Sequence, residues 1–230
     1  MKVLQFTRIF ALMVALTMMS VAVHYGITEK TGKTYFNFLI WNLFLAWLPF
    51  IISMVTYECQ KRFVYKGMGW FVFLAGLVWL LVFPNAFYIS TDLIHLVAMK
   101  NTYILRGEIT FNYWLDFVLI FLFVWHGIVL GFVSTYQFHL MVRQRLHPMM
   151  GWIFVLATSF LAGYGILLGR EYRLNSWHVL TNPVALRSTI EDSLTKENLL
   201  FCLLFGLVIA TVYLTFYSLI HLTSSVPRKK

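Results

Sequence analysis

A short polar segment carries the side chains of this chain that are best suited to chemistry. Asn85 follows a proline at the end of a long apolar run, and Tyr88, Asp92 and His95 come after it at helical spacing. In a resumed helix these four side chains share one face. Asp92 and His95 then lie one turn apart, where an aspartate can fix the tautomer of a histidine and raise its basicity. The segment predicts either a catalytic or binding site or a buried hydrogen-bond network.

A second polar cluster follows the fifth apolar run. Arg170 and Arg173 are three residues apart, and guanidinium groups suit carboxylates or phosphates. Three interpretations stay open for them: pairing with Asp92 or Asp116, binding of an anionic headgroup or substrate, or a simple anchor whose charged end reaches water.

The candidate site residues come from these clusters and from the start of the fourth apolar run. Asp92 and His95 are the catalytic candidates. The binding candidates are Asn85, Tyr88, Thr91, Asp116, Arg170, Arg173, Asn175 and Trp177. We expect no metal and no cofactor, because the sequence lacks His-x-x-x-His and Cys-x-x-Cys spacings. His126 lies in the middle of an apolar run, where packing and proton transfer are both open interpretations.

Composition places these residues in a membrane protein. Of 230 residues, 60% are hydrophobic and 12% are charged, whereas a soluble domain has roughly 25% charged residues. Six runs reach the length of about 20 apolar residues that a spanning helix needs. They are 8–25, 36–57, 68–89, 114–137, 149–169 and 199–222. We therefore predict a single all-α domain over 1–230, a polytopic helix bundle whose third span is broken by proline and continues as an amphipathic segment at the outer face.

Charge distribution predicts how the bundle is oriented. If the N-terminus is cytoplasmic, the inner segments hold ten of the 18 lysines and arginines and only one of the nine acids. Basic residues favour the cytoplasmic side, so we expect both termini inside and both polar clusters outside. The net charge of +9 is spread over short loops. That pattern indicates topology control and contact with anionic lipid rather than binding of nucleic acid.

Three motifs together resemble a known family. They are Phe-Pro-Asn-Ala-x-Tyr-Ile-x-Thr-Asp-Leu-x-His-Leu at 83–96, Tyr-Trp-x-Asp at 113–116 and Leu-Gly-Arg-x-x-Arg-Leu-Asn-Ser-Trp at 168–177. In this order they resemble the bacterial multi-pass membrane proteins catalogued as domain of unknown function 1361. The resemblance implies an integral protein of the bacterial cell membrane and supplies no activity. His178 stands where members usually have a second acidic residue, so no role for that carboxylate is carried over.

Three functions remain open from the sequence. The first is an enzyme at the outer leaflet that acts on an anionic lipid or lipid-linked substrate. The second is a small transporter, and the third is a non-catalytic subunit or assembly factor of an envelope complex. A pocket at Asp92, His95 and Arg170 would favour the enzyme. A cavity that continues toward His126 would favour transport, and full pairing of Asp92 without a pocket would favour a structural role.

Overall fold

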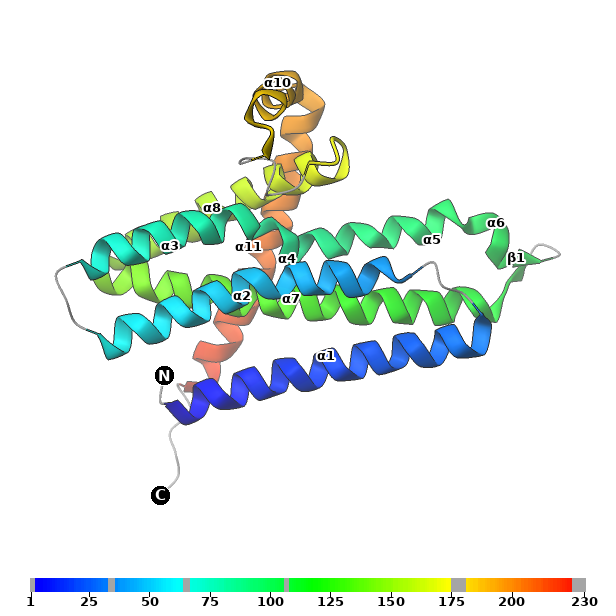
Figure 1. Ribbon diagram of the computed structural model, residues 1–230, viewed down its shortest axis with the longest axis horizontal. Helices are drawn as coiled ribbons and strands as arrows, with labels where there is room; N and C mark the ends of the chain where they lie inside the picture. The colour runs from blue at the N-terminus through cyan, green and yellow to red at the C-terminus, as the bar shows by residue number, and fades with distance from the viewer. Residues whose placement is uncertain (1–2, 33–35, 64–66, 106–107, 175–180, 225–230) are drawn as a thin grey trace.

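Long apolar helices make up most of the computed structural model, which describes residues 3–32, 36–63, 67–105, 108–174 and 181–224 (Figure 1). Within these residues, six helices are long and apolar enough to cross a membrane. They are Thr7–Thr31, Phe38–Arg62, Met68–Ala98, Phe111–Arg145, Pro148–Arg170 and Lys196–Leu222. The predicted all-α bundle with six spans is confirmed, and each helix is longer than the apolar run that predicted it. The chain is a multi-pass membrane protein.

The spanning helices are joined by shorter elements. The long helices are α1 (Val3–Thr31), α2 (Phe38–Arg62), α3 (Met68–Val82), α7 (Phe111–Arg145), α8 (Pro148–Arg170) and α11 (Lys196–Ser224). The short elements are α4 (Pro84–Tyr88), the 3-10 helix η1 (Ile89–Leu93), α5 (Ile94–Ala98), α6 (Lys100–Tyr103), β1 (Ile104–Leu105), β2 (Glu108–Ile109) and α10 (Pro183–Ser193). The two strands pair antiparallel, with Ile104 opposite Ile109.

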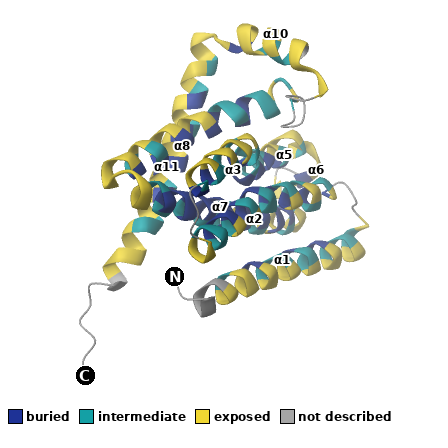
Figure 2. Cartoon of the chain, turned by 60° about the vertical axis from the view of Figure 1, so that its left-hand side comes forward, coloured by how far each residue is buried: buried dark blue, intermediate teal, exposed yellow. Residues whose placement is uncertain are grey.

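Helix α7 lies at the centre of the bundle. It is the most buried of the six spanning helices, and α1 is the least buried. In Figure 2, α7 is largely dark blue (buried), whereas α1 is mostly yellow and teal (exposed and intermediate). Helices α1, α2 and α8 pack against α7, while α11 packs mainly against α8. Beside α7, the fully buried Trp79 of α3 stacks on Phe83 with 4.3 Å between ring centroids. The central α7 therefore connects α1, α2 and α8.

The third span is broken at the proline, as predicted. Helix α3 ends at Val82, and Pro84 begins α4. A proline is well tolerated at the first position of a helix because its missing N–H would have no partner there. The chain then continues through η1 and α5, so the apolar helical segment extends to Ala98 and includes Asp92 and His95. The helical continuation after the break agrees with the predicted amphipathic segment.

The bundle has two distinct ends. The short elements α6, β1 and β2, which precede α7, and the helix α10, which precedes α11, lie on the same side of the spanning helices, which we call the long-loop end. The start of α1 and the end of α11 lie together at the opposite end (Figure 1), as an even number of spans requires. Which end faces the cytoplasm stays a prediction from the charge distribution.

Candidate functional site

The broken third span is held between two pairs of glycines. The pairs are Gly127 and Gly131 in α7, and Gly165 and Gly169 in α8. A Cβ at Gly127 would lie 2.6 Å from the carbonyl oxygen of Ala86, and one at Gly165 would collide with Pro84. No side chain larger than hydrogen fits at these contacts. Gly165 and Gly169 therefore allow α8 to pack closely against α4, including Tyr88 at its end.

Asp92 joins three helices through its carboxylate. The side chain is buried, with 1% of its surface exposed. The amide Nδ2 of Asn42 in α2 donates a hydrogen bond of 2.7 Å to Asp92 Oδ2. Nη1 of Arg170, the last residue of α8, lies 3.5 Å from Asp92 Oδ1. The structure thus pairs Asp92 with Arg170, one of the predicted arrangements, and adds an asparagine that the motifs did not include.

His95 lies next to Asp92 without a direct hydrogen bond. Its Nε2 is 4.0 Å from Asp92 Oδ1, which exceeds the usual N–H···O range. The imidazole lies against Phe38, with ring centroids 4.6 Å apart, and 35% of the side chain is exposed. The spacing of Asp92 and His95 did predict their proximity. In this geometry, however, Asp92 does not fix the tautomer of His95.

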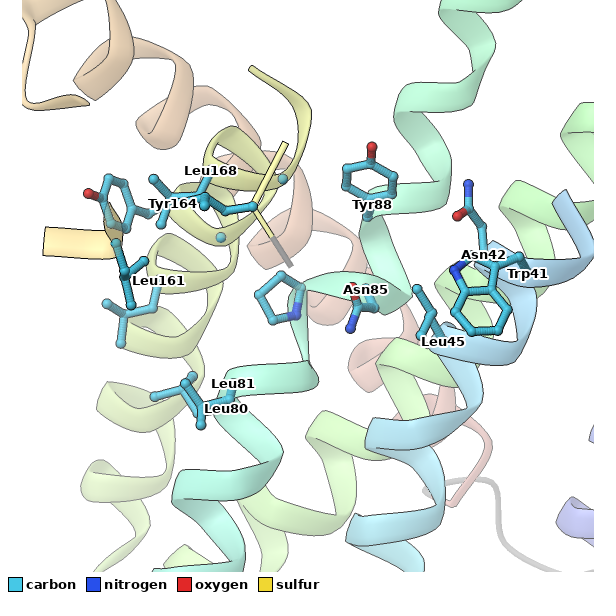
Figure 3. A pocket seen from close by; sticks show the side chains of 15 residues that line it. Trp41, Asn42, Leu45, Leu80, Leu81, Asn85, Tyr88, Leu161, Tyr164 and Leu168 are labelled. Atoms are coloured by element: carbon cyan, nitrogen blue, oxygen red, sulfur yellow. The ribbon is translucent and has the colours of Figure 1, made fainter. Parts of the chain in front are cut away.

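A cavity of about 350 Å³ lies between α2, α4 and α8 (Figure 3). Its lining residues are Trp41, Asn42, Leu45, Leu80, Leu81, Pro84, Asn85, Tyr88, Leu161, Tyr164, Gly165, Leu168, Gly169, Leu174 and Leu186. Asp92 and Arg170 are not among these residues, but each contacts one that is. Asn42 donates to Asp92, and the guanidinium carbon of Arg170 lies 6.0 Å from the centre of the Tyr88 ring. The charged pair therefore lies directly behind the polar part of the cavity wall.

The other binding candidates lie in different surroundings. Thr91 Oγ1 donates to the carbonyl of Tyr88 at 2.7 Å, which ties it to its own helical turn. Asp116 is fully buried and accepts a 2.8 Å hydrogen bond from the Tyr103 hydroxyl. Arg173 is exposed and has a φ of +53°. Asn175 and Trp177 lie outside the described residues.

His126 lies in a helix interface away from the cavity. Its Nε2 is 3.5 Å from the hydroxyl of Thr17 in α1, and that hydroxyl accepts a 3.0 Å hydrogen bond from Trp47 of α2. The imidazole packs edge-on against the same indole. His126 is not among the described residues that line the cavity. These contacts favour the packing interpretation over a proton path.

Sequence reasoning missed Asn42, which connects the cavity to Asp92. One signal was present, because an asparagine within an otherwise apolar span is costly unless it has a buried partner or a function. Tyr164, whose hydroxyl lies 2.7 Å from Ser193 Oγ of α10, was missed as well. It resembles an ordinary interfacial tyrosine, and nothing in the sequence marks it as a cavity residue.

The comparisons with known proteins add a family and no function. The family model described as "Protein of unknown function (DUF1361)" matches residues 41–212. The matched region contains the cavity and all ten candidate site residues. It begins after α1, the least buried helix. No curated protein matches the chain. No solved structure matches it either.

Proposed function

We propose that this chain, which belongs to the DUF1361 family, binds an anionic amphiphile in the cavity between α2, α4 and α8. One observation carries the proposal: a cavity that is apolar over most of its wall adjoins, at its polar end, the ion pair of the buried Asp92 with the partly exposed Arg170. Ligand sites commonly combine apolar walls with a few polar groups that orient the ligand. Here the polar groups suit a phosphate or carboxylate.

Arg170 is the residue that we assign to the anionic group. Its contact with Asp92 uses one guanidinium nitrogen, and a guanidinium group carries five N–H donors. The pair with Asp92 therefore leaves donors for a second acceptor and holds the side chain beside Tyr88. Asn85 and Tyr88 line the cavity and supply further polar contacts. Asp92 then acts as the residue that positions Arg170.

Acid–base catalysis by Asp92 and His95, which lie beside the cavity and do not line it, is a second candidate. The observation that favours it is the position of His95, which is one third exposed and 4.0 Å from the buried Asp92 carboxylate. Catalytic hydrogen bonds are often long in a ligand-free site and shorten when substrate binds. With the orientation predicted from the charges, such chemistry takes place at the outer leaflet. His95→Gln should then abolish conversion of a bound lipid while leaving its affinity unchanged.

The test of the main proposal compares two arginines. Purified protein in micelles of a neutral detergent is titrated with dihexanoyl phosphatidate and, separately, with dihexanoyl phosphatidylcholine. Arg170→Gln should weaken phosphatidate binding about tenfold or more, because a hydrogen bond to a charged group contributes roughly 1.5–3 kcal/mol. Arg187→Gln removes an exposed arginine of α10 that pairs with Glu191 at 2.9 Å, and should change nothing.

Two results would contradict the proposal. One is equal affinity of the wild type for the anionic and the zwitterionic lipid. The other is unchanged phosphatidate binding in Arg170→Gln. The thermal midpoint of each variant shows whether a loss of binding reflects a loss of folding.

A further inference from the structure

The cavity has an apolar open side. Trp41, Leu81 and Leu161 line it and are 53%, 48% and 50% exposed. Figure 3 shows Trp41 and Leu161 on opposite sides of the cavity. All three belong to helices that are long and apolar enough to span the membrane. Half-exposed apolar side chains on such helices face lipid chains, so this side of the cavity opens toward the bilayer.

The long-loop end of the cavity is covered by other apolar side chains. Leu174, just beyond the end of α8, and Leu186 of α10 line the cavity from this end and are half-buried. Helix α10 is fastened where it ends, because Asn198 Nδ2 donates to the carbonyl of Ser193 at 3.0 Å. The Ser193 hydroxyl also bonds to Tyr164 of α8 at 2.7 Å. Leu174 and Leu186 therefore cover the cavity on the side of the long-loop end, and α10, which carries Leu186, is held in place by these hydrogen bonds.

The size of the cavity limits how much of a ligand it can enclose. Its volume of about 350 Å³ lies at the lower end of the roughly 300–1,000 Å³ that ligand pockets have. A membrane lipid with long chains is too large for this space. An amphiphile bound through its headgroup must leave most of its chain outside, and the apolar open side is where a chain can remain in contact with lipid.

We infer that the ligand enters sideways from the bilayer, between Trp41 on one side and Leu81 and Leu161 on the other. This inference rests on the proposed function. Its ligand is a membrane-resident amphiphile with a phosphate or carboxylate head and at least one long chain. The head reaches Tyr88 and Arg170, and the chain stays in the hydrocarbon layer. A water-soluble anion has no need of this route.

The test blocks each route with a tryptophan. Leu81→Trp narrows the open side, and Leu186→Trp narrows the long-loop side. Leu77→Trp is the matched control, because Leu77 lies one turn from Leu81, is 47% exposed and does not line the cavity. Each protein is placed in phosphatidylcholine vesicles that contain phosphatidate with a photoactivatable diazirine in its chain. Cross-linking to the protein is then measured.

Lateral entry predicts that Leu81→Trp reduces cross-linking of cavity residues to the level of the unirradiated sample. Leu77→Trp and Leu186→Trp should label like the wild type. All variants should still bind the soluble dihexanoyl phosphatidate in micelles, which shows that the headgroup site is intact. Undiminished labelling of Leu81→Trp, or loss of labelling in Leu186→Trp alone, would overturn lateral entry and leave the proposed function standing. If the wild type binds neither lipid, the proposed function itself fails.

Discussion

Removing Arg170 should destabilise the ligand-free protein more than removing the charge of Asp92, because the two side chains are buried to different degrees. Asp92 is 1% exposed, whereas Arg170 is 22% exposed. Arg170→Met leaves a buried carboxylate without its ion-pair partner. Asp92→Asn leaves a guanidinium whose long side chain can reach water, and the new amide can still accept the hydrogen bond from Asn42.

The geometry sets the size of the effect. Two unit charges 3.5 Å apart attract by about 5 kcal/mol at an effective dielectric constant of about 20, and desolvation offsets part of that. Loss of one partner from a buried pair costs roughly 3–5 kcal/mol. We expect about 3 kcal/mol for Arg170→Met, about 1–2 kcal/mol for Asp92→Asn, and only about 1 kcal/mol for the double variant, which has no buried charge. The coupling energy is then about 3–4 kcal/mol.

Cys202 offers a way to measure this cycle. It is buried, and the other cysteine, Cys59, can be replaced by serine. Reactivity of the Cys202 thiol toward a maleimide dye, followed during titration with dodecyl sulfate in mixed micelles, reports unfolding. The exposed pair of Arg187 and Glu191 is the control, and its coupling should not exceed about 0.5 kcal/mol. Additive effects of the Asp92 and Arg170 substitutions, or a larger effect for Asp92→Asn, would refute the reasoning.

Two further predictions concern backbone contacts. Gly165→Ala should destabilise the protein by roughly 1–3 kcal/mol, because the added methyl group collides with the proline that begins α4. Gly26→Ala, where nothing lies within 4 Å, should be neutral or stabilise α1 by up to about 1 kcal/mol; similar effects of the two would contradict the contact. Arg173→Gly should raise stability by about 1 kcal/mol, because the residue has a φ of +53°. The same change should weaken phosphatidate binding if Arg173 contacts the ligand, and unchanged affinity would remove Arg173 from the site.

The membrane architecture could be predicted from sequence because its signals are local. A run of about 20 apolar residues needs no knowledge of its neighbours to be recognised as a span. The break at Pro84 is equally local, because the missing N–H and the fixed φ act at that residue. The burial of Asp92 against Asn42 and Arg170 is not local in this sense, because both partners come from other helices.

The site could be predicted only in part. The sequence indicates which residues lie on the same side of the membrane, but it does not indicate which of them contact one another. Asp116 and Arg170 were both placed toward one end of the bundle, but the sequence did not indicate that Asp116 accepts a hydrogen bond from Tyr103 of α6. The cavity depends on how α2 and α8 approach α4, and no residue pattern encodes that distance. Asn42 shows the same limit. The sequence reveals that a polar side chain lies in an apolar span, which is energetically unfavourable without a partner, but it does not reveal that the partner is Asp92.

The glycine contacts explain why the polar segment can serve as a fixed wall of a site. Ala86 and Pro84 lie against Gly127 of α7 and Gly165 of α8 with no intervening side chain. Because these two contacts involve a backbone carbonyl and a proline ring, no flexible side chain at these points can absorb a displacement of α4. Asn85 and the residues that follow are therefore positioned by the packing of three helices. A ligand that binds such a pre-organised wall does not have to order it, so more of its contact free energy appears as affinity.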